Sequence, residues 1–177
     1  MNIIRPILGA LLAVSLAARV SAQADAKPNE IVAAIKKHAE ICSDAQLKLD
    51  FEKFLPYVPA KLLGFMGGKE GLTKTLTQQS AEIKRRGITI DSVKIGTPDK
   101  PKELGGLLVG LVPQELVLTT PQGKLVSMSH LLAISENKGE SWVFVDCMSI
   151  NDEKLGILYP TLKGKIDLPP NQTKLAE

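Results

Sequence analysis

The sequence predicts an α+β fold in which N-terminal helices pack against an antiparallel β-sheet. Hydropathy follows a helical period over residues 29–87 and alternates every two residues over 88–147, and turns rich in proline and glycine separate the alternating segments. Helices followed by hairpin-connected strands are typical of an α+β layer with helices on one face of the sheet. We therefore take this architecture as the starting hypothesis.

The first 22 residues are predicted to be a secretory signal peptide. Arg5 supplies the positive start, a short apolar run follows, and small residues allow cleavage after Ala22 or Ala24. The apolar run ends before Arg19, so it is shorter than the roughly 20 residues that a membrane-spanning helix needs. We expect a secreted or periplasmic protein with no membrane contact once the signal is removed.

Composition argues against a nucleic-acid partner. The chain has 177 residues and a net charge of +3, and removal of Arg5 and Arg19 with the signal leaves a net charge of about +1. Aromatic residues make up 4% of the chain, too few for a base-stacking platform. The remaining length, about 150 residues, suits one domain. We assign it to residues 28–169, followed by a flexible tail at 170–177.

Helices are expected in the first half of the domain. Residues 30–42 carry an apolar stripe with lysines on the opposite side. The next helical segment is interrupted at Pro56 and Pro59, because proline cannot continue a helix interior. A third helix is predicted over residues 69–86, with Gly87 as its terminating residue.

Strands are expected in the second half. The alternation over residues 88–96 slips once, as a β-bulge would cause. The run 107–120 contains Pro113, so it is either one bent strand or two short ones. Two further strands, at 124–134 and 141–146, complete an antiparallel meander.

The two cysteines have two interpretations. In an oxidising compartment Cys42 and Cys147 could form a disulfide, which would stabilise the fold by about 4 kcal/mol in the chain-entropy model. Alternatively they are separate buried thiols, since free cysteine packs like a small apolar residue. Two cysteines and two histidines at no ligand spacing do not form a zinc site, and the sequence predicts neither a metal nor a cofactor.

Several segments resemble a group of small secreted bacterial proteins of largely unknown function. These segments are FLPYVPAKLLGFMGGKEGL, VPQELVLTTPQGKLVSMSHLLAIS and WVFVD. The group in turn resembles the nuclear transport factor 2-like superfamily, of cystatin-like fold, whose curved antiparallel sheet wraps around helices as a cone. The resemblance implies a cone-shaped sheet. It implies no reaction, because the superfamily holds isomerases, dehydratases and cyclases beside members that only bind or scaffold.

His130 is the first candidate for a pocket. Successive strand residues point to opposite faces, so Met128, His130 and Leu132 share one face of their strand. This face carries the bulkier side chains and is the expected core face. An inward His130 among apolar neighbours would favour its neutral form and suit a general base. The alternative is a histidine that is only packed in the core.

Asp146 is the second candidate. It shares a face with Trp142 on the last strand and could lie at the mouth of the cone, where it would polarise a ligand or act as a base. Alternatively it ends the strand as a turn former that accepts backbone N–H groups. Tyr57 and Asp50 are further candidates for the rim of the pocket.

Two functions follow. The first is a non-catalytic domain that binds a small apolar ligand or a protein partner. The second is an isomerase- or dehydratase-type enzyme that uses His130 or Asp146 as general base and Tyr57 as oxyanion donor. A homodimer through the outer face of the sheet is compatible with both, and apolar area for it would come from Val117, Val143 and Val145.

Overall fold

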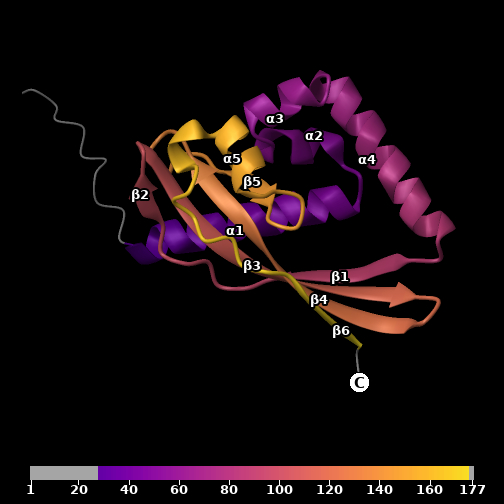
Figure 1. The fold of residues 1–177 in the computed structure, drawn as a ribbon. Helices are drawn as coiled ribbons and strands as arrows, with labels where there is room; N and C mark the ends of the chain where they lie inside the picture. Colours follow the sequence, from indigo (N-terminus) through magenta and orange to yellow (C-terminus); the bar gives the residue numbers. More distant parts are fainter. Residues whose placement is uncertain (1–27, 176–177) are drawn as a thin grey trace, which may run out of the picture.

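The computed structural model describes residues 28–175, and the predicted signal segment lies outside them. The fold is α+β, with helices on the N-terminal side and a six-stranded antiparallel sheet that is not closed (Figure 1). The helices are α1 (Pro28–Leu47), α2 (Phe51–Phe54), the 3-10 helix η1 (Leu55–Tyr57), α3 (Ala60–Phe65), α4 (Gly68–Arg85), α5 (Asp152–Leu158) and the 3-10 helix η2 (Pro160–Leu162). The strands are β1 (Thr89–Ile95), β2 (Lys102–Leu104), β3 (Leu107–Thr120), β4 (Gly123–Ser135), β5 (Val143–Asp146) and β6 (Gln172–Leu175). The predicted fold class is confirmed.

A long β3–β4 hairpin forms the centre of the sheet. Strands β1 and β2 pair with the free edge of β3, and β5 and β6 pair with the free edge of β4. The predicted slip in β1 is a bulge between Ile90 and Ser92. β3 is one continuous strand through Pro113, because β1 ends opposite Gln114 and the missing N–H lies just past that ladder.

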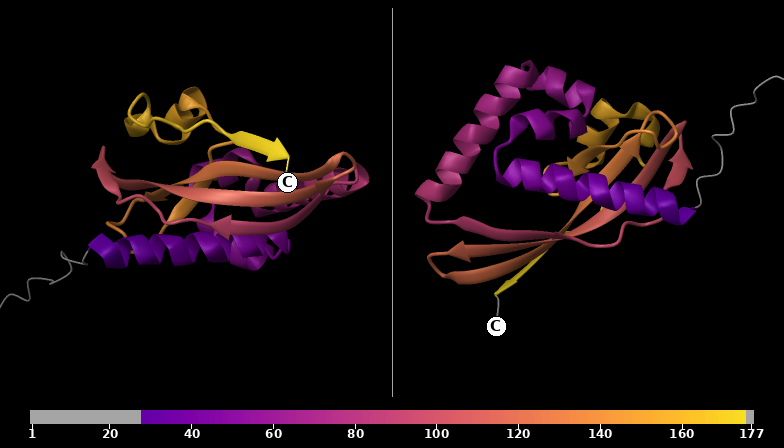
Figure 2. Two further views of the ribbon diagram at one scale, coloured as in Figure 1. Left: turned by 90° about the horizontal axis from the view of Figure 1, so that it is seen from below. Right: turned by 180° about the vertical axis from the view of Figure 1, so that it is seen from behind.

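Both faces of the sheet carry a core. Helix α1 covers one face, here called the α1 face, and α5 with η2 covers the other, the α5 face (Figure 2, left). The α1-face core contains Ile35, Ala39, Cys42, Ile95, Val112, Leu131, Ala133, Trp142 and Phe144. The α5-face core contains Val109, Leu132, Ile134, Val145, Cys147, Leu155, Leu158, Tyr159 and Leu162. The expectation of one core face is therefore corrected, because α5 adds a second layer after the last central strand.

Helix α4 is held at its ends more than along its length. Gly67 and Gly87, with φ angles of 79° and 71°, bound it with left-handed turns that glycine adopts without strain. Leu72 is the buried residue among the 18 of the helix. The helix thus runs from α3 to the start of β1 as an arch beside the sheet (Figure 1).

The C-terminal residues differ from the expected flexible tail. Gln172–Leu175 form β6, which pairs with β4 from Leu125 to Met128, and the hydroxyl groups of Ser127 and Thr173 lie 3.1 Å apart. The edge of β4 beyond β5 offers unpaired backbone groups, and the C-terminal strand satisfies them.

The possible disulfide is not formed. Both cysteines are free and buried. Cys42 belongs to the α1-face core and Cys147 to the α5-face core, so the sheet separates them. The structure agrees with the second interpretation, in which the cysteines are two separate buried thiols.

Candidate functional site

A cavity of about 450 Å³ lies on the α1 face, between the C-terminal end of α1, helix α4 and the sheet. Small-molecule sites span roughly 300–1,000 Å³, so the volume suits a small ligand. Its apolar lining comes from Leu47, Leu49, Leu76, Ile83, Ile88, Ile90, Val93, Leu116 and Leu131. The cavity exists because α4 arches past the sheet while α1 packs directly on it (Figure 2, right).

The walls leave apolar surface uncovered. Ile83 of α4 is 36% exposed and Leu47 of α1 is 39% exposed, and both line the cavity. Each 100 Å² of such surface removed from water contributes about 2.5 kcal/mol. An apolar ligand in this space would therefore be stabilised by burial alone.

Polar groups from α1 and from the strands of the sheet also line the cavity, and the side of the cavity that the sheet forms is here called its floor. Gln114 of β3 and Ser43 of α1 line the cavity although both are buried. Ser129 of β4 lies opposite Gln114 and two residues from Leu131, so it shares their face, but it is not among the residues that line the cavity. Its side chain is 1% exposed, and its Oγ has no hydrogen-bond partner in residues 28–175. Unpaired polar groups of this kind are destabilising unless something binds them.

Asp146 lines the cavity and also ends β5. Its Oδ1 accepts a hydrogen bond from the Met148 N–H at 2.8 Å, and its backbone carbonyl accepts one from the Ser149 hydroxyl at 2.9 Å. Burial raises the pKa of Asp146, and the hydrogen bond from Met148 opposes this shift. The structure shows the turn-forming role, and Oδ2, which has no hydrogen bond within the described chain, is left free at the cavity.

His130 lies on the other side of the sheet. It is half-buried opposite Pro113 and shares the α5 face with Leu132, whereas Asp146 pairs with Leu131 and so faces α1. His130 is not among the residues that line the cavity, and its Nδ1 is buried with no partner in the part of the chain described. Adjacent strand residues point oppositely, so the structure does not bring His130 and Asp146 together.

Tyr57 is on the α1 face but outside the cavity lining. Its hydroxyl lies 3.3 Å from Nδ1 of His38, and its ring centroid is 6.0 Å from that of Phe144. Burial, followed by the charge of Lys37, lowers the pKa of His38. The pair joins α1 to η1, and the sheet separates Tyr57 from His130 on the other face.

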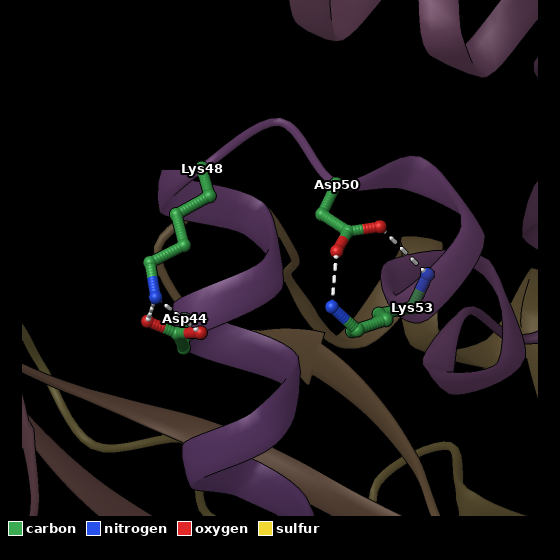
Figure 3. A network of polar contacts seen from close by, with 4 residues as sticks. All are labelled: Asp44, Lys48, Asp50 and Lys53. Carbon is green, nitrogen blue, oxygen red and sulfur yellow. Dashed lines mark hydrogen bonds and ion pairs between the residues drawn. The ribbon is translucent and has the colours of Figure 1, made fainter.

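Asp50 has a local structural role. It caps α2 by accepting the Lys53 N–H at 3.3 Å, and it pairs with the Lys53 ammonium at 2.7 Å, beside the Asp44–Lys48 pair (Figure 3). The hydrogen bonds from Lys53 lower the pKa of Asp50. Its carboxylate is therefore occupied at the helix start, and it does not line the cavity.

The other predicted pocket residues also lie elsewhere. Trp142 is 2% exposed within the α1-face core, and Met128 is exposed on the α5 face beside β6. Of the predicted pocket residues, Asp146 alone lines the cavity. Sequence reasoning missed Gln114, which lines the cavity. Parity shows which residues share its face of β3, but only the packing of α1 and α4 leaves that face open at Gln114.

The apolar residues proposed for a dimer interface are mostly covered. Val145 is in the α5-face core, and Val143 packs against it. Only Val117 lies on the stretch of β3 paired with β1, beyond α5. The α5 helix thus occupies much of the area that the dimer prediction requires.

No family model, no curated protein and no solved structure matches the chain. The resemblance to the nuclear transport factor 2-like superfamily stays a prediction. Within residues 28–175, no cluster of His, Cys, Asp or Glu side chains is arranged to hold a metal ion. No helix of that part of the chain is long and apolar enough to cross a membrane.

Proposed function

We propose that this is an exported, non-catalytic protein that binds a small, mainly apolar ligand in the cavity between α1, α4 and the sheet. The observation that carries the proposal is the lining of that cavity: nine apolar side chains, interspersed with polar groups from α1, α4 and the sheet. Binding sites for small molecules have this composition, with a few polar groups that orient the ligand.

The alternative, an isomerase- or dehydratase-type enzyme, has less support. Proton transfer in such reactions requires groups that converge on the reacting atoms. Among the described residues of the lining, Asp146 is the only carboxyl, and neither histidine is present. A single carboxyl with one free oxygen suits ligand orientation better than acid–base catalysis.

Two neighbouring glutamines of α4 provide a matched test. Gln78 and Gln79 are both exposed, but only Gln79 lines the cavity. We expect Gln79→Trp to obstruct the mouth and weaken binding of the neutral probe N-phenyl-1-naphthylamine at least tenfold, while Gln78→Trp leaves binding unchanged. Probe fluorescence measures the affinity, and circular dichroism checks the fold.

A second variant is needed because the Trp side chain introduced at Gln79 could turn toward solvent and leave the cavity open. Ser80 lines the cavity and is half-buried, so Ser80→Trp should also weaken binding, with exposed Thr77 outside the lining as the control position. Absence of saturable probe binding to the wild type would contradict the proposal. Equal affinity in the wild type and both obstructed variants would do the same.

A further inference from the structure

We propose that the ligand carries a hydrogen-bond-donating head, best a protonated amine, which Asp146 binds on the sheet side of the cavity with help from Gln114. This rests on the proposed function and narrows its ligand to a class. The apolar part of the ligand would then lie between α4 and the end of α1, against Leu76, Ile83 and Leu47.

The hydrogen-bonding capacity of the floor is only partly used. Oδ1 of Asp146 accepts from Met148, and Oδ2 has no partner within residues 28–175. The Ser129 hydroxyl is buried without a partner, and no side-chain hydrogen bond of Gln114 is found in the described chain. Gln114 of β3 and Asp146 of β5 therefore line the cavity with free hydrogen-bonding capacity, whereas Ser129 of β4 lies on the same face outside the lining. Two polar groups with free capacity in one largely apolar lining suit a ligand that carries a hydrogen-bond donor.

The charge at the floor selects the head group. Asp146 is the acidic group of the lining, and the other charged side chain is Lys84, on the exposed last turn of α4. The elements that pack around the cavity otherwise present neutral residues to it: Ser43 and Gln46 from α1, Gln79 and Ser80 from α4, Thr89 from β1 and Gln114 from β3. A partly buried carboxylate that forms no ion pair within residues 28–175 favours a cationic ligand.

The state of Asp146 agrees with this geometry. Burial raises its pKa, which means that the surroundings disfavour its charged form. A bound ammonium group would offset that effect through a charge-assisted hydrogen bond to Oδ2. An anionic head would be repelled from the floor and attracted instead to Lys84 at the rim.

Three ligands that share a decyl chain test the inference on the wild-type protein. Decylamine, decanol and decanoate, each below its micelle concentration, compete with N-phenyl-1-naphthylamine at neutral pH. We expect decylamine to displace the probe at a concentration at least tenfold lower than decanoate, with decanol between them. Wild-type measurements alone decide this order, so the test does not depend on a variant that folds.

The variant Asp146→Asn tests whether the carboxylate of Asp146 causes the preference for decylamine over the other two ligands. Asparagine keeps the Oδ1 acceptor for Met148, so the turn is retained. We expect the preference for decylamine over decanol to disappear while decanol still binds. Asp167→Asn, an exposed carboxylate outside the lining, should leave the order unchanged.

The outcomes separate the two proposals. If neither the probe nor any decyl ligand binds, the proposed function fails. If all three bind equally, or decanoate binds best and Lys84→Gln removes its advantage, the function stands and the donor-head inference is overturned. An amine preference that persists in Asp146→Asn would also overturn it.

Discussion

The two faces of the sheet share strands but differ in how they are covered. On the α5 face, Leu132 and Ile134 meet Leu155 and Leu162, and all four are fully buried. On the α1 face, α1 packs on β1 and β3, but the surface toward the start of β1 opens into the cavity beside α4. The difference teaches that the covering helix, and not the strands, decides whether a face becomes core or site.

The helices differ in sequence as well as in position. Two of the seven residues of α5, Leu155 and Leu158, are buried, whereas α4 buries Leu72 out of 18. A helix with so small a buried stripe cannot pack along its length against a sheet. Its glycine-bounded ends hold it as an arch, and the space below it is the cavity.

Adjacent leucines of β4 allow a direct comparison of the two faces, with the largest expected effect. Leu132 is fully buried in the α5-face core, and Leu131 borders the cavity. We expect Leu132→Ala to lower the free energy of unfolding by about 3–4 kcal/mol and Leu131→Ala by about 2 kcal/mol. Leu131 already lacks packing atoms on its cavity side, so its truncation loses fewer contacts. Urea denaturation measures both.

Met128 provides the control, since it is on the same strand and exposed beyond α5. Met128→Ala should change the free energy of unfolding by less than about 1 kcal/mol. Equal losses for the two leucine variants would show that the α1 face is as tightly packed as the α5 face. That result would contradict an open cavity.

The pH dependence of Asp146→Asn sharpens the comparison with a smaller effect. The pKa of Asp146 is raised by burial, so its ionisation opposes folding. Near pH 3, below the ordinary carboxyl pKa of about 3.9, the folded and unfolded forms are both largely protonated and the wild type bears little of this penalty. As pH rises through the folded pKa, the wild type should lose stability relative to Asp146→Asn, and the difference should then stay constant.

Urea midpoints of both proteins at about pH 3 and about pH 7 measure this difference. A wild type that gains stability over the variant with rising pH would indicate a cationic partner of Asp146 in the protein itself. That outcome would also weaken the amine inference.

The cysteines, one on each face, should show no effect of reduction. Burial raises the pKa of Cys42 and of Cys147 to about 12, so neither is a reactive thiolate in the folded protein. We expect identical gel mobility with and without reductant, no labelling by a thiol reagent in the native state, and labelling of both after denaturation. A mobility shift on reduction would contradict the separation of the two cores.

Local patterns predicted much of the fold. The slip in β1, the end of α4 at Gly87 and the reversal after Thr120 follow from chain chemistry within a few residues, and the structure has each of them. The second core was not predicted, because the sequence of the short helix α5 does not reveal which face of the sheet the helix will cover. The strand β6 was missed since all its residues are exposed and carry no apolar pattern.

Of the residues that line the cavity, the sequence predicted only Asp146. The others were missed because residues distant in the chain form the site. Parity stated that His130 and Leu131 point to opposite faces, but not which face opens, and the bulkier face proved to be the filled one. Gln114 and Asp146 lie far apart in the chain and reach the same cavity only through the register of β3, β4 and β5.

By itself, the sequence determined the long helices, the central strands and the alternation of side chains along each strand, because these depend on residues close by in the chain. Only the tertiary structure decided that α5 fills one face, that α4 stands clear of the other, and that Asp146 lies at the floor of the resulting cavity. Those features depend on how distant segments pack, and this packing is set by strand register and by the distance of each helix from the sheet.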